Sequence, residues 1–160
     1  MRDGTGQALA TVDRAGEIAD STGNPLLLAP LRFEGRSDRG TNAMLDVSDP
    51  NGTPLGEVRL KRYSVTPRSR KATLSITAAE SEVARLEPQD GKGEELAITS
   101  GDRPVGTLHS TGKRGFIRRS TNYRLELTGD VDDRVRQLVL AAAIRYDALL
   151  TAAASASLGD

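Results

Sequence analysis

Residues 138 to 144 read Leu-Val-Leu-Ala-Ala-Ala-Ile, an unbroken apolar run that decides the fold. The run is too long and too rich in alanine for one strand, so it predicts a helix from about Asp133 to about Ala154. Most large apolar residues of this helix fall on one face, but Leu140 and Ile144 fall on the opposite side. Middle turns that are apolar all round are typical of a helix buried on all sides. The sequence therefore predicts a fold that encloses its carboxy-terminal helix.

The chain ahead of this helix consists of short segments that alternate between apolar and polar residues. Gly56 to Lys61 and Thr73 to Ala78 both place apolar side chains at even positions, and Leu96 with Ile98 follows the same rule. A period of two is typical of half-buried strands. Clusters of Gly with Asp, Asn or Ser separate the segments and indicate turns. We therefore expect a mainly β fold, an antiparallel sandwich or barrel, with one carboxy-terminal helix.

An internal repeat emerges when the chain is shifted by about 50 residues. Pro54-Leu55-Gly56-Glu57-Val58 lies over Pro104-Val105-Gly106-Thr107-Leu108. About one residue further out of register, Thr73 to Ile76 lies over Arg124 to Leu127. A weaker third copy begins at Gly23-Asn24-Pro25-Leu26-Leu27. The repeat predicts that equivalent hairpins recur along the sheet.

The second copy and the helix together resemble a known family. Pro104 to Leu108, Gly115 to Arg119, Asn122 to Leu127 and the helix Gln137 to Leu150 are similar in order and spacing to the carboxy-terminal half of phospholipid scramblases. Leu60-Lys61-Arg62-Tyr63-Ser64 resembles the LURP-one-related proteins.

Both families belong with the tubby carboxy-terminal domain in one superfamily. The resemblance implies a closed antiparallel barrel of about twelve strands around a central hydrophobic helix. We expect this barrel domain to span residues 16–154, between a flexible amino terminus (1–15) and a flexible tail (155–160).

Scramblases carry an acidic, calcium-associated segment just before the last strand, and this chain departs from that pattern. The aligned residues here are Arg119-Ser120-Thr121-Asn122-Tyr123, which lack the carboxylates that a calcium site needs. Within the helix, Arg145 occupies a position where the family is usually apolar, which argues against membrane insertion. We therefore do not expect calcium-dependent lipid scrambling.

Composition narrows the function classes further. The 160 residues include 22 Lys and Arg, 22 Asp and Glu, one His and no Cys, so the formal net charge is zero. The absence of Cys excludes disulfides and thiolate metal sites, and we expect neither a metal nor an organic cofactor. Gly101 to Gly106 lacks the Lys and Ser/Thr of a phosphate-binding loop, and Ser110 to Lys113 is more simply a polar loop than a nucleophile pair, so we expect no enzymatic activity.

The sequence also bears on localisation. The amino terminus has no apolar run of signal-peptide length, so we expect a cytoplasmic protein. The apolar run 138–144 is far shorter than the ~20 residues that a membrane-spanning helix needs, so we expect no transmembrane segment and, at most, peripheral association with a membrane.

Two basic stretches that contain no acidic residue are the best functional signal in the sequence. They lie at matching positions of the two main repeat copies, with an acidic stretch between them. Cations on neighbouring rims would concentrate positive potential for an anionic partner. The candidate anion-binding residues are Lys61, Arg62, Arg68, Arg70, Lys71, Lys113, Arg114, Arg118 and Arg119.

The partner of these cations stays open at this point. Tubby-like domains imply phosphoinositide head groups, and an anionic membrane surface would serve equally well. The alternatives are a protein partner, or solvated hairpin positions where Lys and Arg only protect strand edges from aggregation. Nucleic acid is less favoured, because the isoelectric point is about 6.6 and only 3% of the residues are aromatic.

Three further side chains carry structural expectations. Tyr63 and Phe116, at comparable points of the two copies, are expected to pack in the barrel. Asp147 lies late in the buried helix and needs a partner, for which Arg136 or an arginine on a strand is the best candidate. His109 alternates with Leu108, so we expect it to point outward.

Overall fold

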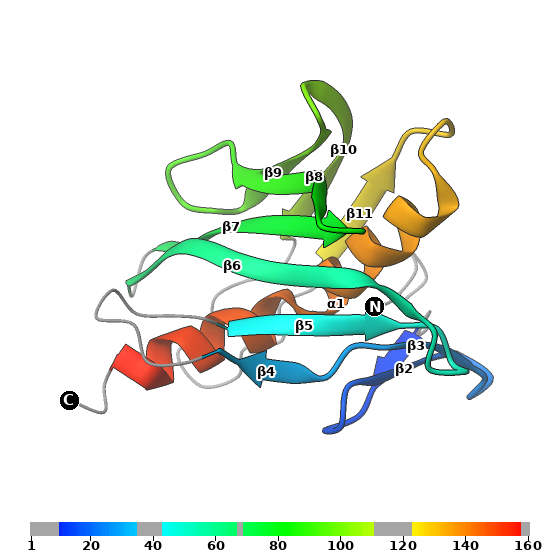
Figure 1. The fold of residues 1–160 in the computed structure, drawn as a ribbon. Helices are drawn as coiled ribbons and strands as arrows, with labels where there is room; N and C mark the ends of the chain where they lie inside the picture. The colour runs from blue at the N-terminus through cyan, green and yellow to red at the C-terminus, as the bar shows by residue number, and fades with distance from the viewer. Residues whose placement is uncertain (1–9, 35–42, 67–68, 111–122, 158–160) are drawn as a thin grey trace.

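The computed structural model describes residues 10–34, 43–66, 69–110 and 123–157, which form eleven strands and one helix (Figure 1). The strands are β1 (Ala10–Val12), β2 (Glu17–Asp20), β3 (Pro25–Leu28), β4 (Leu31–Phe33), β5 (Ala43–Ser48), β6 (Pro54–Thr66), β7 (Ser69–Ala78), β8 (Ser81–Pro88), β9 (Glu95–Ser100), β10 (Arg103–Ser110) and β11 (Tyr123–Leu127). The helix α1 (Asp133–Ser157) follows them.

All eleven strands join one antiparallel sheet in the order β1-β2-β3-β5-β6-β7-β8-β9-β10-β11, with β4 paired to β5. The mainly β fold with a carboxy-terminal helix is therefore as predicted. The sheet packs around α1, which contacts β5, β6, β7, β8 and β11. Among the described residues, however, no hydrogen-bonded pairing joins β1 to β11. The structure therefore shows a sheet of eleven strands that hydrogen bonds among the described residues do not close, and the expected closed barrel of about twelve strands is not confirmed.

The internal repeat is confirmed by the strand register. β6 pairs with β5 at Pro54 and Gly56 and skips Leu55, while β10 pairs with β9 at Pro104 and Gly106 and skips Val105. Each skipped residue forms a β-bulge at the same point of its copy. The weaker third copy has the bulge too, since β3 pairs with β2 at Pro25 and Leu27.

Glycine is required at the same position of both main copies. A Cβ at Gly56 would overlap the backbone carbonyl of Thr77 on β7, and a Cβ at Gly106 would overlap the backbone carbonyl of Glu126 on β11. The sequence repeat thus preserves a bulge and the close strand approach beside it.

The helix begins where the sequence predicts. The Asp132 side chain caps it by accepting hydrogen bonds from the backbone amides of Arg134 (2.9 Å) and Val135 (3.4 Å). Its apolar face is fully buried against the sheet, but Leu140 and Ile144 are only partly buried. The expectation of a helix buried on all sides is therefore only partly met, because these two side chains pack against the core but remain partly accessible to solvent.

The helix also passes a simple test for a membrane span. Within the segment Asp133–Ser155, the most apolar window of 18 residues has a mean hydropathy of 1.4, and 56% of that window is buried inside the protein. Length and composition of this kind are shared by the core helices of globular proteins, and here most of the apolar window packs against the strands.

Two domain boundaries differ from the sequence expectation. β1 lies inside residues 1–15, which were expected to be flexible, and it pairs with β2. The helix continues to Ser157, inside the expected tail 155–160. Both segments therefore contribute regular structure to the domain.

The antiparallel order gives the sheet two distinct ends. The turn end carries the connections 21–24, 49–53, 79–80, 101–102 and 128–132. The hairpin end is marked by three pairs of residues that face each other where strands leave and return: Thr66 with Ser69, Pro88 with Leu96, and Ser110 with Tyr123. The helix starts at the turn end, where the Arg134 guanidinium donates to the carbonyl of Leu55, and it runs toward the hairpin end.

Candidate functional site

The β6–β7 hairpin carries the part of the predicted anion site that the structure describes. Lys61 and Arg62 lie on β6, and Arg70 and Lys71 lie on β7. The other candidates, Arg68, Lys113, Arg114, Arg118 and Arg119, lie outside the described residues.

Arg62 and Lys71 share the outer face of this hairpin. Tyr63 pairs with Ala72, which is buried, so this pair faces inward. The neighbouring pairs therefore face outward: Arg62 stands opposite Thr73, and Lys71 stands opposite Ser64. Arg62 and Lys71 are diagonal neighbours, a spacing of about 7–8 Å that long side chains can span. The hairpin thus presents two cations side by side.

These two cations differ from the other described basic side chains on strands. Arg32, Arg59, Arg85, Arg103 and Arg124 each have a carboxylate oxygen within 2.9 Å. Within the part of the chain that the structure describes, the side chains of Arg62 and Lys71 form neither an ion pair nor a hydrogen bond. Their charge is therefore available to a partner.

Lys61 occupies a β-bulge, because the register skips from Leu60 to Arg62. It lies in the field of Glu82, whose pKa is lowered by the hydroxyl of Ser75, by Arg85 and by Lys61. Ser75 is buried and donates its hydroxyl proton to the Glu82 carboxylate. Part of the charge of Lys61 is therefore already compensated.

Arg70 has a structural role. Its Nη1 lies 3.7 Å from the Asp147 carboxylate on α1, and its buried Nε has no partner among the described residues. Tyr123, at the start of β11, donates its hydroxyl proton to the same carboxylate at 2.7 Å. Burial and the Asp147 charge together raise the pKa of Tyr123 well above its usual range. The expectation of a strand arginine for Asp147 is confirmed, whereas Arg136 pairs with Asp133 instead.

Tyr146 completes this cluster at the hairpin end. Its hydroxyl accepts a hydrogen bond from the backbone amide of Ala72 at 3.1 Å, and burial raises its pKa to about 12. The rings of Tyr123 and Tyr146 meet edge to face at 5.8 Å. The helix is thereby tied to β7 and to β11, which flank the two basic stretches. This role of Tyr123 was not predicted, because nothing in the sequence around it points to a carboxylate 24 residues away.

The second basic stretch, residues 113–119, lies outside the described residues. The strands that precede and follow it, β10 and β11, pair at Ser110 and Tyr123 at the hairpin end of the sheet. Between the two hairpins stands the loop 89–94, which contains Asp90, Lys92 and Glu94. The acidic stretch therefore separates the two basic connections in the order of the sheet.

The remaining expectations on single side chains fit the strand pattern. Tyr63 is partly buried and packs against the core, as expected, and Phe116 lies outside the described residues. His109 stands beside buried Leu108 on the other strand face, with its Nδ1 4.0 Å from the Glu95 carboxylate. Among the described residues, no group of three or more His, Asp or Glu could hold a metal ion.

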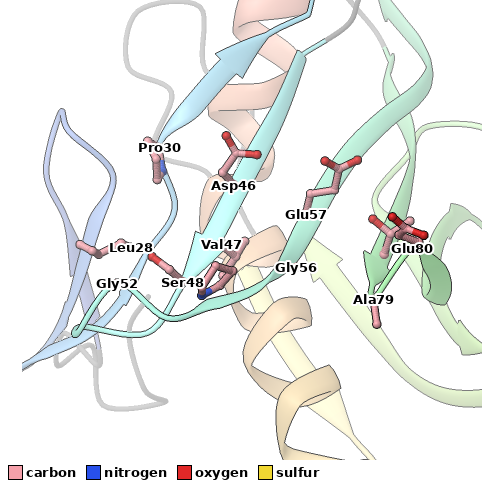
Figure 2. A pocket seen from close by; sticks show the side chains of 12 residues that line it. Leu28, Pro30, Asp46, Val47, Ser48, Gly52, Gly56, Glu57, Ala79 and Glu80 are labelled. Carbon is pink, nitrogen blue, oxygen red and sulfur yellow. The ribbon is translucent and has the colours of Figure 1, made fainter.

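A hollow of about 650 Å³ lies away from the basic hairpin, on the outer face near the turn end (Figure 2). Asp46, Glu57 and Glu80 line it. The Asp46 carboxylate already binds Arg32 at 2.7 Å, and the Glu57 carboxylate binds Arg59 at 2.9 Å. Two of its three acids are thus compensated, so the hollow offers a cationic ligand little net charge.

Comparisons with known proteins do not extend this description. No family model matches the chain, and neither a curated protein nor a solved structure matches it.

Proposed function

We propose that this protein is a non-enzymatic binding module for anionic phospholipid head groups, acting peripherally at a cytoplasmic membrane surface. The observation that carries the proposal is the pair Arg62 and Lys71, two outward cations without partners among the described residues, while other strand arginines are in ion pairs. Lys61 stands beside them at the bulge.

The expected strength is modest. A basic residue close to an anionic leaflet contributes about 1 kcal/mol, and the contribution falls off within a Debye length. Arg62, Lys71 and Lys61 alone would therefore give weak, reversible and salt-sensitive binding. Arg68, Lys113, Arg114, Arg118 and Arg119 stay in the proposal on the ground of their sequence positions. Arg70 does not, because Asp147 holds it inside.

The family resemblance supports the same proposal. An antiparallel sheet packed around a carboxy-terminal apolar helix is compatible with the tubby and scramblase superfamily. We include in the proposal that the sheet closes into the barrel of that superfamily, which would require pairing across the seam between β1 and β11.

Vesicle co-sedimentation tests the lipid proposal. At low salt, the protein should sediment with phosphatidylcholine vesicles that contain about 30% anionic phosphatidylserine. It should stay in solution with neutral vesicles of phosphatidylcholine alone. The double variant Arg62→Glu/Lys71→Glu should lose this binding while its circular dichroism stays unchanged.

A matched control separates the site from net charge. Arg14→Glu/Arg103→Glu makes the same change in net charge at an exposed turn and at the turn end of the sheet. It should retain at least half of the binding. Equal loss in both double variants, or no binding to any vesicle, would reject the proposed lipid site, and the second result would favour a protein partner instead.

A further inference from the structure

Charge is distributed unequally between the two ends of the sheet. The five connections at the turn end contain Asp49, Glu80, Asp102, Asp130 and Asp132 and no Lys or Arg. The basic pair Arg62 and Lys71 lies on the hairpin at the other end, beside the loop 89–94, whose Asp90, Lys92 and Glu94 carry charges of both signs. A molecule whose net charge is zero therefore still has a charge asymmetry along its strands.

The β6–β7 hairpin projects beyond its neighbour on one side. β5 pairs with β6 only as far as Arg59, so residues 61–66 extend past the described pairing with β5. On the other side the hairpin is braced, because the amide of Arg70 donates to the carbonyl of Lys92 (3.2 Å) and the Ser69 hydroxyl lies 3.3 Å from the carbonyl of Gly91. The tip is thus an exposed but supported element.

An apolar side chain lies at this tip between the cations and the turn. Val65 is 36% exposed, one of four large hydrophobic residues with such exposure among those described. Phe33 is more exposed, at 53%, but it pairs with Ala43 and so lies back near the start of β5. Val65 pairs with Arg70 and therefore lies on the opposite face of the hairpin from Arg62 and Lys71. A bilayer that meets the tip end-on would reach both faces, and its phosphates lie just above the acyl chains.

The length of the molecule favours one orientation on a charged surface. β6 has 13 residues and runs from the turn end to the hairpin tip, about 40 Å at 3.3 Å per residue. The Debye length is about 8 Å at physiological salt, so carboxylates at the turn end would not feel a membrane that touches the tip. The reverse orientation would place the five carboxylates of the turn end against an anionic surface, of which, among the described residues, only Asp130 is compensated by an arginine at 2.8 Å, Arg103.

We infer that the protein docks end-on to an anionic bilayer, with Arg62 and Lys71 at the lipid phosphates and Val65 in the interface, and with the turn end directed away. This inference rests on the proposed function and adds the docking face and its apolar contact.

The absence of cysteine from the sequence permits a direct test. Thr66→Cys at the hairpin tip and Thr53→Cys at the turn end are matched substitutions of exposed threonines. Each is labelled with an environment-sensitive nitrobenzoxadiazole probe and mixed with phosphatidylserine-containing vesicles that carry doxyl-quencher lipids. The emission of the probe at position 66 should shift to shorter wavelength, and the doxyl lipids should quench its fluorescence. The probe at position 53 should show neither change.

A second pair of variants isolates the apolar contact. Val65→Ser should weaken vesicle binding about threefold, because only part of this side chain leaves water. Phe33→Ser should leave binding unchanged although it removes more exposed apolar surface. The protein could sediment with vesicles while the emission of the probe at 66 does not shift, or while the probe at 53 responds equally. Either result would overturn end-on docking and leave lipid binding intact. Failure of the unmodified protein to sediment would instead reject the proposed function itself.

Discussion

Replacing Gly56 or Gly106 by alanine tests whether the two repeat copies are physically equivalent. These glycines lie 50 positions apart, and each follows a bulge in its own strand. In both, an added Cβ would overlap a backbone carbonyl of the next strand, that of Thr77 or of Glu126. A backbone atom cannot rotate away as a side chain does, so the strands themselves must separate.

The cost follows from two opposing effects. Overpacking by one methyl group costs about 1–3 kcal/mol, and a clash with backbone lies at the upper end of that range. Alanine also restricts the unfolded chain, which returns about 0.4–1 kcal/mol. We therefore expect each variant to lose about 2 kcal/mol of unfolding free energy, which is a large share of a typical domain stability of roughly 5–15 kcal/mol.

Urea unfolding followed by circular dichroism measures this loss. Gly91→Ala and Gly129→Ala serve as controls, because a Cβ at either position would meet nothing within 4 Å. Both controls should change stability by less than about 0.5 kcal/mol. A loss of stability in only one of the two repeat variants, or an equally large loss in the controls, would show that the two copies do not share a required close approach.

Two further predictions concern charged groups. Arg145 is only 9% exposed, its Nε has no partner among the described residues, and burial lowers its pKa. Arg145→Met should therefore leave the midpoint of urea unfolding unchanged or raise it, whereas a loss of unfolding free energy above about 1 kcal/mol would show that the charge is stabilising. The hydroxyl of Thr22 and the backbone amide of Asn24 lower the pKa of Asp20 from 3.8 to about 2. The ionised carboxylate therefore stabilises the fold above about pH 4, the pKa of an unfolded aspartate, and this stabilisation is lost as the pH falls toward about 2. Carbon-13 NMR should show the Asp20 carboxyl titrating near pH 2, and Asp20→Asn should remove that part of the acid dependence; a midpoint near pH 4 would contradict it.

Periodicity was sufficient to predict the strands and the helix. Val58, Leu60, Leu74 and Ile76 are buried as their alternation indicates, and the helix begins at Asp133. Such patterns are local, since they depend only on which face of an element is apolar. Closure of the sheet is not local, and Leu140 and Ile144, which are only partly buried, show that an apolar helix need not be fully buried on every face.

The candidate site was predictable only in part, for the same reason. The charge of Arg70 and Lys71 is plain in the sequence, but the two residues face opposite sides of one strand, and only the inward side chain meets Asp147. The acid partner of Arg32 likewise comes from the neighbouring strand β5. Arg59, Arg85 and Arg124, by contrast, bind acids of their own strands, which are close in the sequence. Pairing across the sheet therefore decides the availability of some cations, and that part cannot be read from one stretch of sequence.

The central position of α1 has a consequence for how the chain acquires its fold. Every strand precedes the helix in the sequence, yet the helix supplies the middle of the core. During synthesis, eleven strands emerge before the element that their apolar faces cover, and domains of this size generally fold as units. Until the helix has been synthesised, the apolar faces of the described strands have no helix to cover them. The risk of aggregation is therefore greatest in the interval before the helix emerges, and this is the interval in which a chaperone would act.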